Sequence, residues 1–237
     1  NIGSGAVTAS FAECRNAEAI IVIGANPTVN HPVAATFIKN AAQRGARLYI
    51  LDPRGQHLDR YATESIRFSP GSDVAMLNAM INVIITEELY DADYVAKQTE
   101  GFEDLKARTT HTTPEAMAPI CGVDADTLRR VARGYATAGS AMIFWGMGIS
   151  QHTHGTDNSR CLISLALLTG NVGRAGTGLH PLRGQNNVQG ASDAGLIPMF
   201  FPDYKPVTDT ETRARYEDFW GTTLDPERGL TVVEITN

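Results

Sequence analysis

Residues 19–24 read Ala-Ile-Ile-Val-Ile-Gly, and this stretch is the clearest indication of the fold class. The run is short, β-branched and apolar without interruption, which is typical of a strand covered on both faces of a parallel sheet. A helix is expected to begin at Pro32 and to end before Gly45, and residues 47–51 then form a second strand. Strand, helix and strand in this order predict a βαβ unit, whose crossover is almost always right-handed.

The same alternation continues toward residue 170. The expected elements are a short strand at 65–68, a helix capped by Ser72 or Asp73 that extends to Ile85, smaller helices around 91–97, 113–120 and 124–135, a strand at 141–145 and a helix near 158–168. Strands that alternate with helices predict a doubly wound α/β domain with a mostly parallel, Rossmann-like sheet.

The composition changes after residue 170. Residues 170–190 hold six glycines together with Arg174 and Arg183, which is typical of a loop that bends around a ligand. Prolines and charged residues dominate from Phe200 onward, with weak periodicity. We therefore predict a Rossmann-like domain over residues 1–185 and a partial segment of an adjoining α/β domain over 186–237. The chain has no initiating methionine, so we expect a piece of a longer protein that lacks the N-terminal part of its first domain.

Charge and composition exclude several classes of protein. The net charge is −6 and the isoelectric point is near 5.5, so no basic surface for nucleic acid is indicated. No apolar run approaches the roughly 20 residues that a membrane-spanning helix requires. The three cysteines, Cys14, Cys121 and Cys161, include no Cys-x-x-Cys pair. This count argues against a disulfide framework or a cysteine-bound cluster, and it favours a reducing, cytoplasmic location.

The turns that follow the predicted strands are the places to look for a binding site, because ligands of open parallel sheets lie beyond the carboxyl ends of the strands. These turns are Gly24-Ala25-Asn26-Pro27, Asp52-Pro53-Arg54, Pro70-Gly71-Ser72-Asp73 and Gly146-Met147-Gly148, with Gln151 close behind the last. The Asp52 carboxylate can accept hydrogen bonds from ribose hydroxyls or a guanine edge, and Arg54 can donate to phosphate. Glycines let backbone N–H groups approach phosphate oxygens. Together the turns predict a site for a nucleotide-bearing anion.

Two alternatives for this site are weaker. Asn-Pro, Asp-Pro and Pro-Gly are common turn formers, so each turn taken alone has a purely structural explanation. An NAD site is the other alternative, but the first strand is followed by Gly-Ala-Asn-Pro and the fourth by Gly-x-Gly-x-x-Gln, so the dinucleotide fingerprint is incomplete at both places. The six histidines lack cysteine or carboxylate neighbours at ligand spacing, so no metal ligand is assigned in this chain.

Arg183 is distinct because it lies in a polar, glycine-bracketed stretch with no amphipathic pattern to explain it. The stretch reads Leu-Arg-Gly-Gln-Asn-Asn-Val-Gln-Gly over residues 182–190. A guanidinium held there can bind a small carboxylate through two parallel N–H bonds. The alternative is an arginine on a solvated loop.

Three motifs give the chain a resemblance to a known family. Trp-Gly-Met-Gly-Ile-Ser-Gln at 145–151, Leu-Thr-Gly-Asn at 168–171 and Arg-Gly-Gln-Asn-Asn-Val-Gln-Gly at 183–190 resemble, in order and spacing, the catalytic alpha subunits of molybdenum- or tungsten-dependent formate dehydrogenases. Gly24-x-Asn26-Pro27, 51–54 and 71–73 look like the contacts that this family, related to DMSO reductase, makes with a pterin guanine dinucleotide. The Arg-Gly-Gln-Asn-Asn string is the specific part.

The resemblance implies that a molybdenum or tungsten ion, held by two molybdopterin guanine dinucleotides, oxidises formate to carbon dioxide. Electrons would pass to iron–sulfur clusters outside this chain and to iron–sulfur or flavin subunits, including an NAD-reducing partner. Arg183 would orient the formate carboxylate. The residues that would hold the cofactor are Gly24, Asn26, Asp52, Arg54, Gly71, Asp73, Met147, Gly148, Gln151 and Gln185. A metal-ligating cysteine or selenocysteine is expected before Asn1, so the chain alone is expected to be inactive.

Two related hypotheses stay open. Nitrate reductases and other molybdopterin oxidoreductases resemble this chain around Gly146 to Gln151, but they usually lack the Arg-Gly-Gln-Asn-Asn string. A non-catalytic scaffold, like the degenerate family member in respiratory NADH dehydrogenase, would keep the fold without the pterin. The presence of Asp52, Arg54 and Met147 in this sequence argues against that loss.

Overall fold

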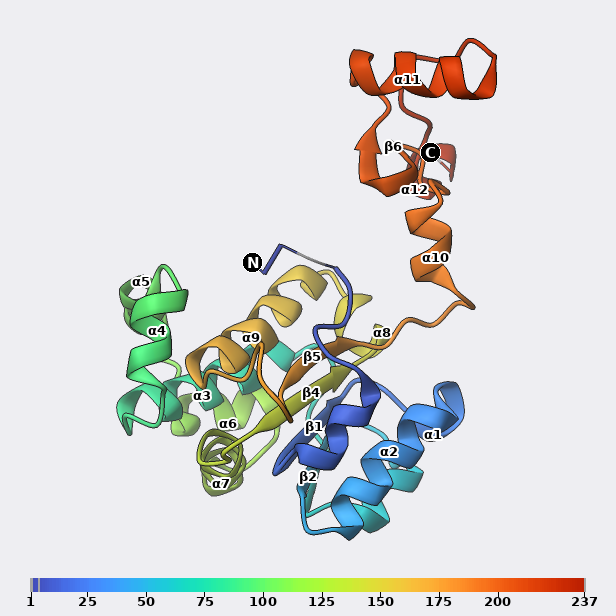
Figure 1. The fold of residues 1–237 in the computed structure, drawn as a ribbon. Coiled ribbons are helices and arrows are strands. Elements are labelled where there is room, and N and C mark those ends of the chain that lie inside the picture. The colour runs from blue at the N-terminus through green and yellow to red at the C-terminus, as the bar shows by residue number, and fades with distance from the viewer. Residues whose placement is uncertain (1, 4, 237) are drawn as a thin grey trace. The chain divides into compact units, whose positions relative to one another are not determined.

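The computed structural model describes residues 2–3 and 5–236 of the chain (Figure 1). The chain divides into two compact units, the first ending at Leu182 and the second beginning at Arg183. The assignment of residues 186–237 to an adjoining α/β domain stays a prediction. Across the described residues, every helix is too short or too polar to span a lipid bilayer.

The first unit is built on a five-stranded parallel sheet in the order β3-β2-β1-β4-β5. The strands are β1 (Ala19–Ile23), β2 (Arg47–Leu51), β3 (Glu64–Ile66), β4 (Ala141–Trp145) and β5 (Gly178–Pro181). This order is that of a doubly wound fold, in which the chain winds outward from the centre in two directions. The predicted α/β class and Rossmann-like sheet are therefore confirmed.

Side chains from successive residues of the central strands enter two different cores. Ile21 and Ile143 belong to the larger core, whereas their neighbours Val22 and Phe144 belong to the smaller one on the opposite face. Each residue of β1 and β4 is buried. Because the period of a strand is two, both faces need apolar residues, which is why the run at 19–23 contains no polar position.

Helices cover both faces of this sheet (Figure 1). The smaller core lies under α2 (Pro32–Gln43) and two 3₁₀ helices, Phe11–Asn16 and His57–Tyr61. The larger core includes residues of α3 (Asp73–Thr86), α4 (Ala92–Gln98), α6 (Pro114–Cys121), α7 (Ala125–Ala136) and α9 (Gly155–Leu168). The short helices α1 (Pro27–Asn30) and α8 (Met147–Ser150) follow β1 and β4. Another helix of the first unit, α5 (Phe102–Thr109), was not expected from the sequence, since most of its residues are polar.

The prediction of an uninterrupted loop at 170–190 was wrong. Strand β5 lies inside this range and pairs in parallel with β4. Helix α10 (Val188–Asp193) begins two residues before the predicted end of the loop at Gly190. The sequence of β5, Gly-Leu-His-Pro, has little intrinsic strand preference. Tertiary contacts hold it instead: the fully buried ring of His180 stacks on Phe144 at 4.5 Å between centroids, and its Nε2 lies 2.8 Å from the Ala9 carbonyl oxygen.

The second unit is small and its core is aromatic. It contains a two-stranded antiparallel pair, β6 (Phe200–Phe201) and β7 (Lys205–Pro206), with a 3₁₀ turn at Pro202–Tyr204, and the helices α10, α11 (Thr210–Trp220) and α12 (Val232–Thr236). The ring of Tyr216 on α11 lies 5.0 Å from that of Phe201 and 4.8 Å from that of Trp220. Helix α11 was also missed from the sequence, because its pattern is dominated by charged residues.

Asn171, from one of the three motifs, has a structural role. Its side chain is fully buried, and its Oδ1 accepts a hydrogen bond of 2.9 Å from the backbone N–H of Ala141, where β4 begins. Its Nδ2 donates to Thr169 Oγ1 at 2.7 Å, and Arg174 adds a guanidinium bond of 3.2 Å to the same Oδ1. The asparagine therefore joins the loop after α9 to the start of a central strand.

We expect Asn171→Ala to lower the free energy of unfolding of this chain by about 2 kcal/mol, because a buried backbone N–H loses its acceptor. Urea unfolding followed by circular dichroism measures this change. Asn40→Ala, at an exposed position of α2, is the matched control and should change stability little. Equal stabilities of the two variants would contradict the structural role.

Candidate ligand-binding site at the carboxyl ends of the strands

Strands β1 and β4 are neighbours, and the chain leaves them toward opposite faces of the sheet. It passes from β1 through α1 to α2, which covers the smaller core, and from β4 to α8 and α9, which cover the larger one. Such a change of winding opens a crevice at the carboxyl edge of a parallel sheet. The turns predicted as binding turns lie at this edge.

Three glycines bring the turns after β1 and β4 into backbone contact. Gly148 donates its N–H to the Gly24 carbonyl oxygen at 3.0 Å. A Cβ added to Gly148 would lie 2.6 Å from that oxygen, one on Gly24 would lie 2.8 Å from the Gly148 carbonyl carbon, and one on Gly146 would lie 2.9 Å from the Gly24 oxygen. Gly24 also has a φ of +56°. Close packing of two protein backbones therefore requires glycine at these positions, whatever ligand they also approach.

Asp52 directly follows β2, and its side chain is almost buried, at 7% exposure. Its Oδ1 accepts a bond of 2.8 Å from the backbone N–H of Arg54, and the Arg54 side chain is exposed. Burial raises the pKa of the Asp52 carboxyl above its ordinary value, against the lowering effect of the Arg54 N–H and of the Arg54 and Arg67 charges. Hydrogen bonds from a ligand would stabilise the ionised form of this carboxylate.

Gln56, which the sequence analysis did not single out, lies beside Asp52. Its Nε2 donates to the Ala25 carbonyl oxygen at 3.0 Å and, over a long 3.5 Å, to Asp52 Oδ2. The side-chain oxygen Oε1 is buried and has no hydrogen-bond partner within the part of the chain that the structure describes. The only signal of Gln56 in the sequence is that a polar residue stands four positions after Asp52, the aspartate that follows β2.

The turn before α3 contributes an exposed glycine and a buried carboxyl. Gly71 has a φ of +85° with open space where a Cβ would stand, so the turn conformation is what favours glycine. Asp73 begins α3 and is only 2% exposed. Burial raises its pKa, and the nearby His152 acts in the opposite direction. The structure thus brings the predicted Asp73 close to His152, in the turn before α9.

The remaining predicted residues of the first unit lie in the two short helical turns. Asn26 precedes α1, and its Oδ1 accepts a 2.7 Å bond from Thr28 Oγ1. Met147 begins α8 with 39% of its surface exposed, and Gln151 ends that turn on the surface. Asn158, buried on α9, donates to the Ile149 carbonyl oxygen at 2.9 Å and so holds α8 in place. This asparagine carries no functional signal in the sequence, where it occupies an ordinary helix position.

Arg183 and Gln185 belong to the second unit, at its first residues. Both side chains are exposed, and Arg183 Nη2 donates to Gln189 Oε1 at 3.1 Å. Gln189 in turn donates to Asp193 at 2.9 Å. Hydrogen bonds therefore link Arg183, the first residue of the Arg-Gly-Gln-Asn-Asn string, to Gln189 and Asp193 of α10.

Two buried groups at the carboxyl end of β2 fit a ligand that brings N–H donors. The Asp52 carboxylate has a single short hydrogen bond, and Gln56 Oε1 has none from the described residues. The N–H edge of a guanine is such a ligand. Residues 2–3 and 5–236 contain no group of three His, Cys, Asp or Glu side chains that could hold a metal ion.

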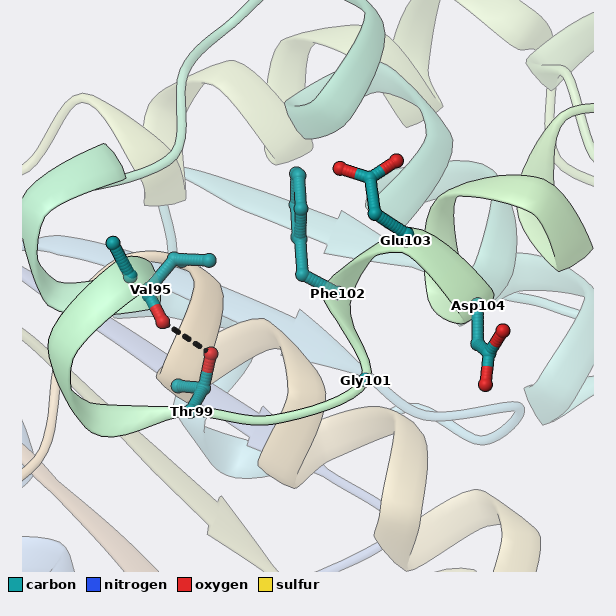
Figure 2. A pocket seen from close by; sticks show the side chains of 7 residues that line it. Val95, Thr99, Gly101, Phe102, Glu103 and Asp104 are labelled. Carbon is teal, nitrogen blue, oxygen red and sulfur yellow. Dashed lines mark hydrogen bonds between the residues drawn. The ribbon is translucent and has the colours of Figure 1, made fainter.

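A cavity of about 480 Å³ between α4 and α5 contains none of the predicted residues. Figure 2 shows that Phe102 and Glu103 extend to one side of α5 while Asp104 points to the other, and that Thr99 Oγ1 donates to the Val95 carbonyl oxygen, at 2.7 Å. The polar groups that line this cavity do not converge on one point, so the candidate site is the crevice at the sheet edge.

The fold is that of a doubly wound α/β domain with the predicted binding turns at one sheet edge, and comparison with known proteins gives its family. The family model described as molybdopterin oxidoreductase matches residues 1–219, so the chain belongs to this family. It is 43% identical to the F420-dependent formate dehydrogenase subunit alpha of Methanocaldococcus jannaschii and 42% identical to formate dehydrogenase H of Escherichia coli strain K12. The matches cover 98% and 99% of this chain but 34% and 33% of those proteins, so the chain spans about a third of their length.

A solved structure supports the same assignment. Acetylene hydratase from Pelobacter acetylenicus superposes with a TM-score of 0.67 and 31% sequence identity, over 73% of this chain and 23% of that one. The resemblance drawn from the three motifs is thereby confirmed at the level of the family and of its formate dehydrogenase members.

We expect Gly148→Ala to destabilise this chain by about 2 kcal/mol, because the added methyl group overlaps the Gly24 carbonyl. Gly55→Ala is the matched control, since its Cβ would meet its nearest neighbour at an ordinary 3.7 Å. Thermal unfolding of both variants measures the difference. A Gly148→Ala chain as stable as Gly55→Ala would show that the backbone contact does not constrain the crevice.

Proposed function

We propose that this chain is the nucleotide-binding part of a formate dehydrogenase catalytic subunit that oxidises formate to carbon dioxide. The observation that carries the proposal is the buried, under-bonded carboxylate of Asp52 at the sheet edge of a family member. Identities of 43% and 42% to formate dehydrogenases over nearly the whole chain support the choice of reaction.

The residues of the crevice fit a molybdopterin guanine dinucleotide. Asp52 would accept the guanine N–H groups, and Arg54, exposed beside it, would donate to phosphate. The loops around Gly24, Asn26, Gly71 and Gly148 would bring backbone N–H groups to the same anion. Asp73, Met147 and Gln151 complete the proposed set of the first unit, and Gln185, in the second unit, is proposed as a further cofactor contact. The bound cofactor, proposed as two dinucleotides, supplies the molybdenum or tungsten that accepts the electrons of formate.

Arg183 would orient the substrate. Its guanidinium could hold both oxygens of formate through two parallel N–H bonds and so fix the orientation of the substrate. Its bond to Gln189 restricts the side chain before substrate binds. The full enzyme would pass electrons to iron–sulfur clusters and to partner subunits of the iron–sulfur or flavin type, including one that reduces NAD.

A reducing compartment such as the cytoplasm suits this protein. All three cysteines are buried and free, and burial raises the pKa of Cys14 and of Cys161 to about 12, which keeps both thiols protonated and unreactive.

The other molybdopterin oxidoreductases remain the second candidate, and the Arg-Gly-Gln-Asn-Asn string disfavours them. A non-catalytic scaffold is the third. Metal analysis of the full-length protein distinguishes the scaffold from the enzymes, since a preparation without any molybdenum or tungsten would favour a scaffold.

We expect Arg183→Ala in the full-length enzyme to lower formate turnover by about a hundredfold, as loss of an oriented charged donor commonly does. Steady-state rates with an artificial electron acceptor measure the loss. Arg213→Ala, in the same unit, is the control and should leave turnover unchanged, because the Arg213 guanidinium donates to the Val207 carbonyl oxygen within that unit. Unchanged turnover in Arg183→Ala would remove the proposed role.

A further inference from the structure

Gln56 has a bonding pattern that points to a function of its amide N–H groups. It is 8% exposed, and both acceptors of its Nε2 lie in the turns that follow β1 and β2. Its oxygen receives no hydrogen bond from the described residues. A buried amide whose donors are used and whose acceptor is not would be costly to retain for packing alone. No motif of the sequence and no comparison assigns it a role.

The two turns that Gln56 joins lie side by side at the edge of the crevice. Strands β1 and β2 pair in register up to Ile23 and Leu51, so the turns after them leave the sheet at the same level. The amide of Gln56 bonds to the Ala25 carbonyl in the first turn and to the Asp52 carboxylate in the second. With Arg54 N–H on the other carboxylate oxygen, both oxygens of Asp52 are held.

The backbone around Gln56 is held by groups besides its own side chain, which takes part in the capping box at the start of the 3₁₀ helix. The Gln56 N–H donates to Asp59 Oδ2 at 2.8 Å, and Arg67 bonds to the same oxygen at 2.5 Å. Arg67 also donates to the Asp52 carbonyl oxygen at 3.3 Å. The bonds of Asp59 and Arg67 should therefore retain the turn when the Gln56 side chain is replaced.

We propose that Gln56 is a positioning residue for guanine recognition, which fixes the plane of the Asp52 carboxylate by donating from its amide across the crevice edge. The proposal rests on the proposed function, because it assumes that Asp52 receives the base. An ionised carboxylate held in one orientation can accept two N–H bonds from one edge of guanine, which gives both affinity and selectivity. The charged groups that act on this carboxylate are Arg54 and Arg67, which favour ionisation, and Asp59, which opposes it.

The test is Gln56→Glu in the full-length protein. An ionised glutamate would place a second carboxylate against Asp52, whereas one proton shared by the pair restores a donor. Protein purified near pH 5.5 is divided, held near pH 5.5 or near pH 8, and separated from free ligand. Guanine nucleotide released by acid is then measured per chain. We expect roughly tenfold less nucleotide near pH 8 than near pH 5.5 in Gln56→Glu, and no such difference in the wild type.

Two further variants complete the test. Gln43→Glu, the same change at an exposed position at the end of α2, should behave like the wild type. Gln56→Leu removes the donors at every pH, so its nucleotide content should be low under both conditions. Melting temperatures measured alongside separate loss of ligand from loss of fold.

Equal losses at both pH values in Gln56→Glu and Gln56→Leu would indicate a packing role and overturn the proposal, as would wild-type contents in both. A wild-type protein that releases no guanine nucleotide would instead refute the proposed function itself, and the positioning role with it.

Discussion

The backbone contact between Gly24 and Gly148 constrains the rest of this structure. A parallel sheet that winds in two directions must part its loops where the winding changes, and here that point lies between β1 and β4. The hydrogen bond from Gly148 to Gly24 holds the two turns together at their closest approach, where no side chain fits. The positions of α1 and α8, and with them the exposed Met147, follow from this contact. The glycines that resemble a cofactor cradle are therefore also required by the protein itself.

The polar groups of the candidate site lie one strand away, in the turn that follows β2. The sheet makes Asp52 both buried and hydrogen-bonded by few groups, and its raised pKa is the electrostatic consequence of that burial. Asp59 and Arg67 hold the turn in shape from outside, while Gln56 reaches inward to the neighbouring turn. The crevice thus combines a rigid backbone with a polar wall whose hydrogen-bonding capacity is only partly used. This combination fits the nucleotide cofactor that we propose, since the polar groups follow several strand ends in succession.

The sequence alone was sufficient for the parts of the fold that depend on local patterns. The run at 19–23 required cover on both faces, and the turns after the strands followed from the parallel order. It was insufficient where tertiary contacts decide: Gly-Leu-His-Pro became β5 because His180 fills a buried position, and the charged residues of α11 concealed a helix that packs through Tyr216 and Trp220. Gln56 and Asn158 could not be identified either, because a single amide gives no sign in sequence of which carbonyl it will meet. The roles assigned to Asp52, Arg183 and their neighbours remain predictions that rest on motif resemblance and on the family.

The proposed function requires a nucleotide to lie over the ends of β1 and β2 with its base against a buried carboxylate. A cryo-EM structure of the cofactor-loaded, full-length protein tests this most directly. We expect a guanine edge within hydrogen-bond distance of both Asp52 oxygens, about 2.7 to 3.2 Å between heavy atoms. A cofactor bound in that protein with its base elsewhere, and Asp52 still buried against protein alone, would contradict the assignment of this sheet edge as the binding site.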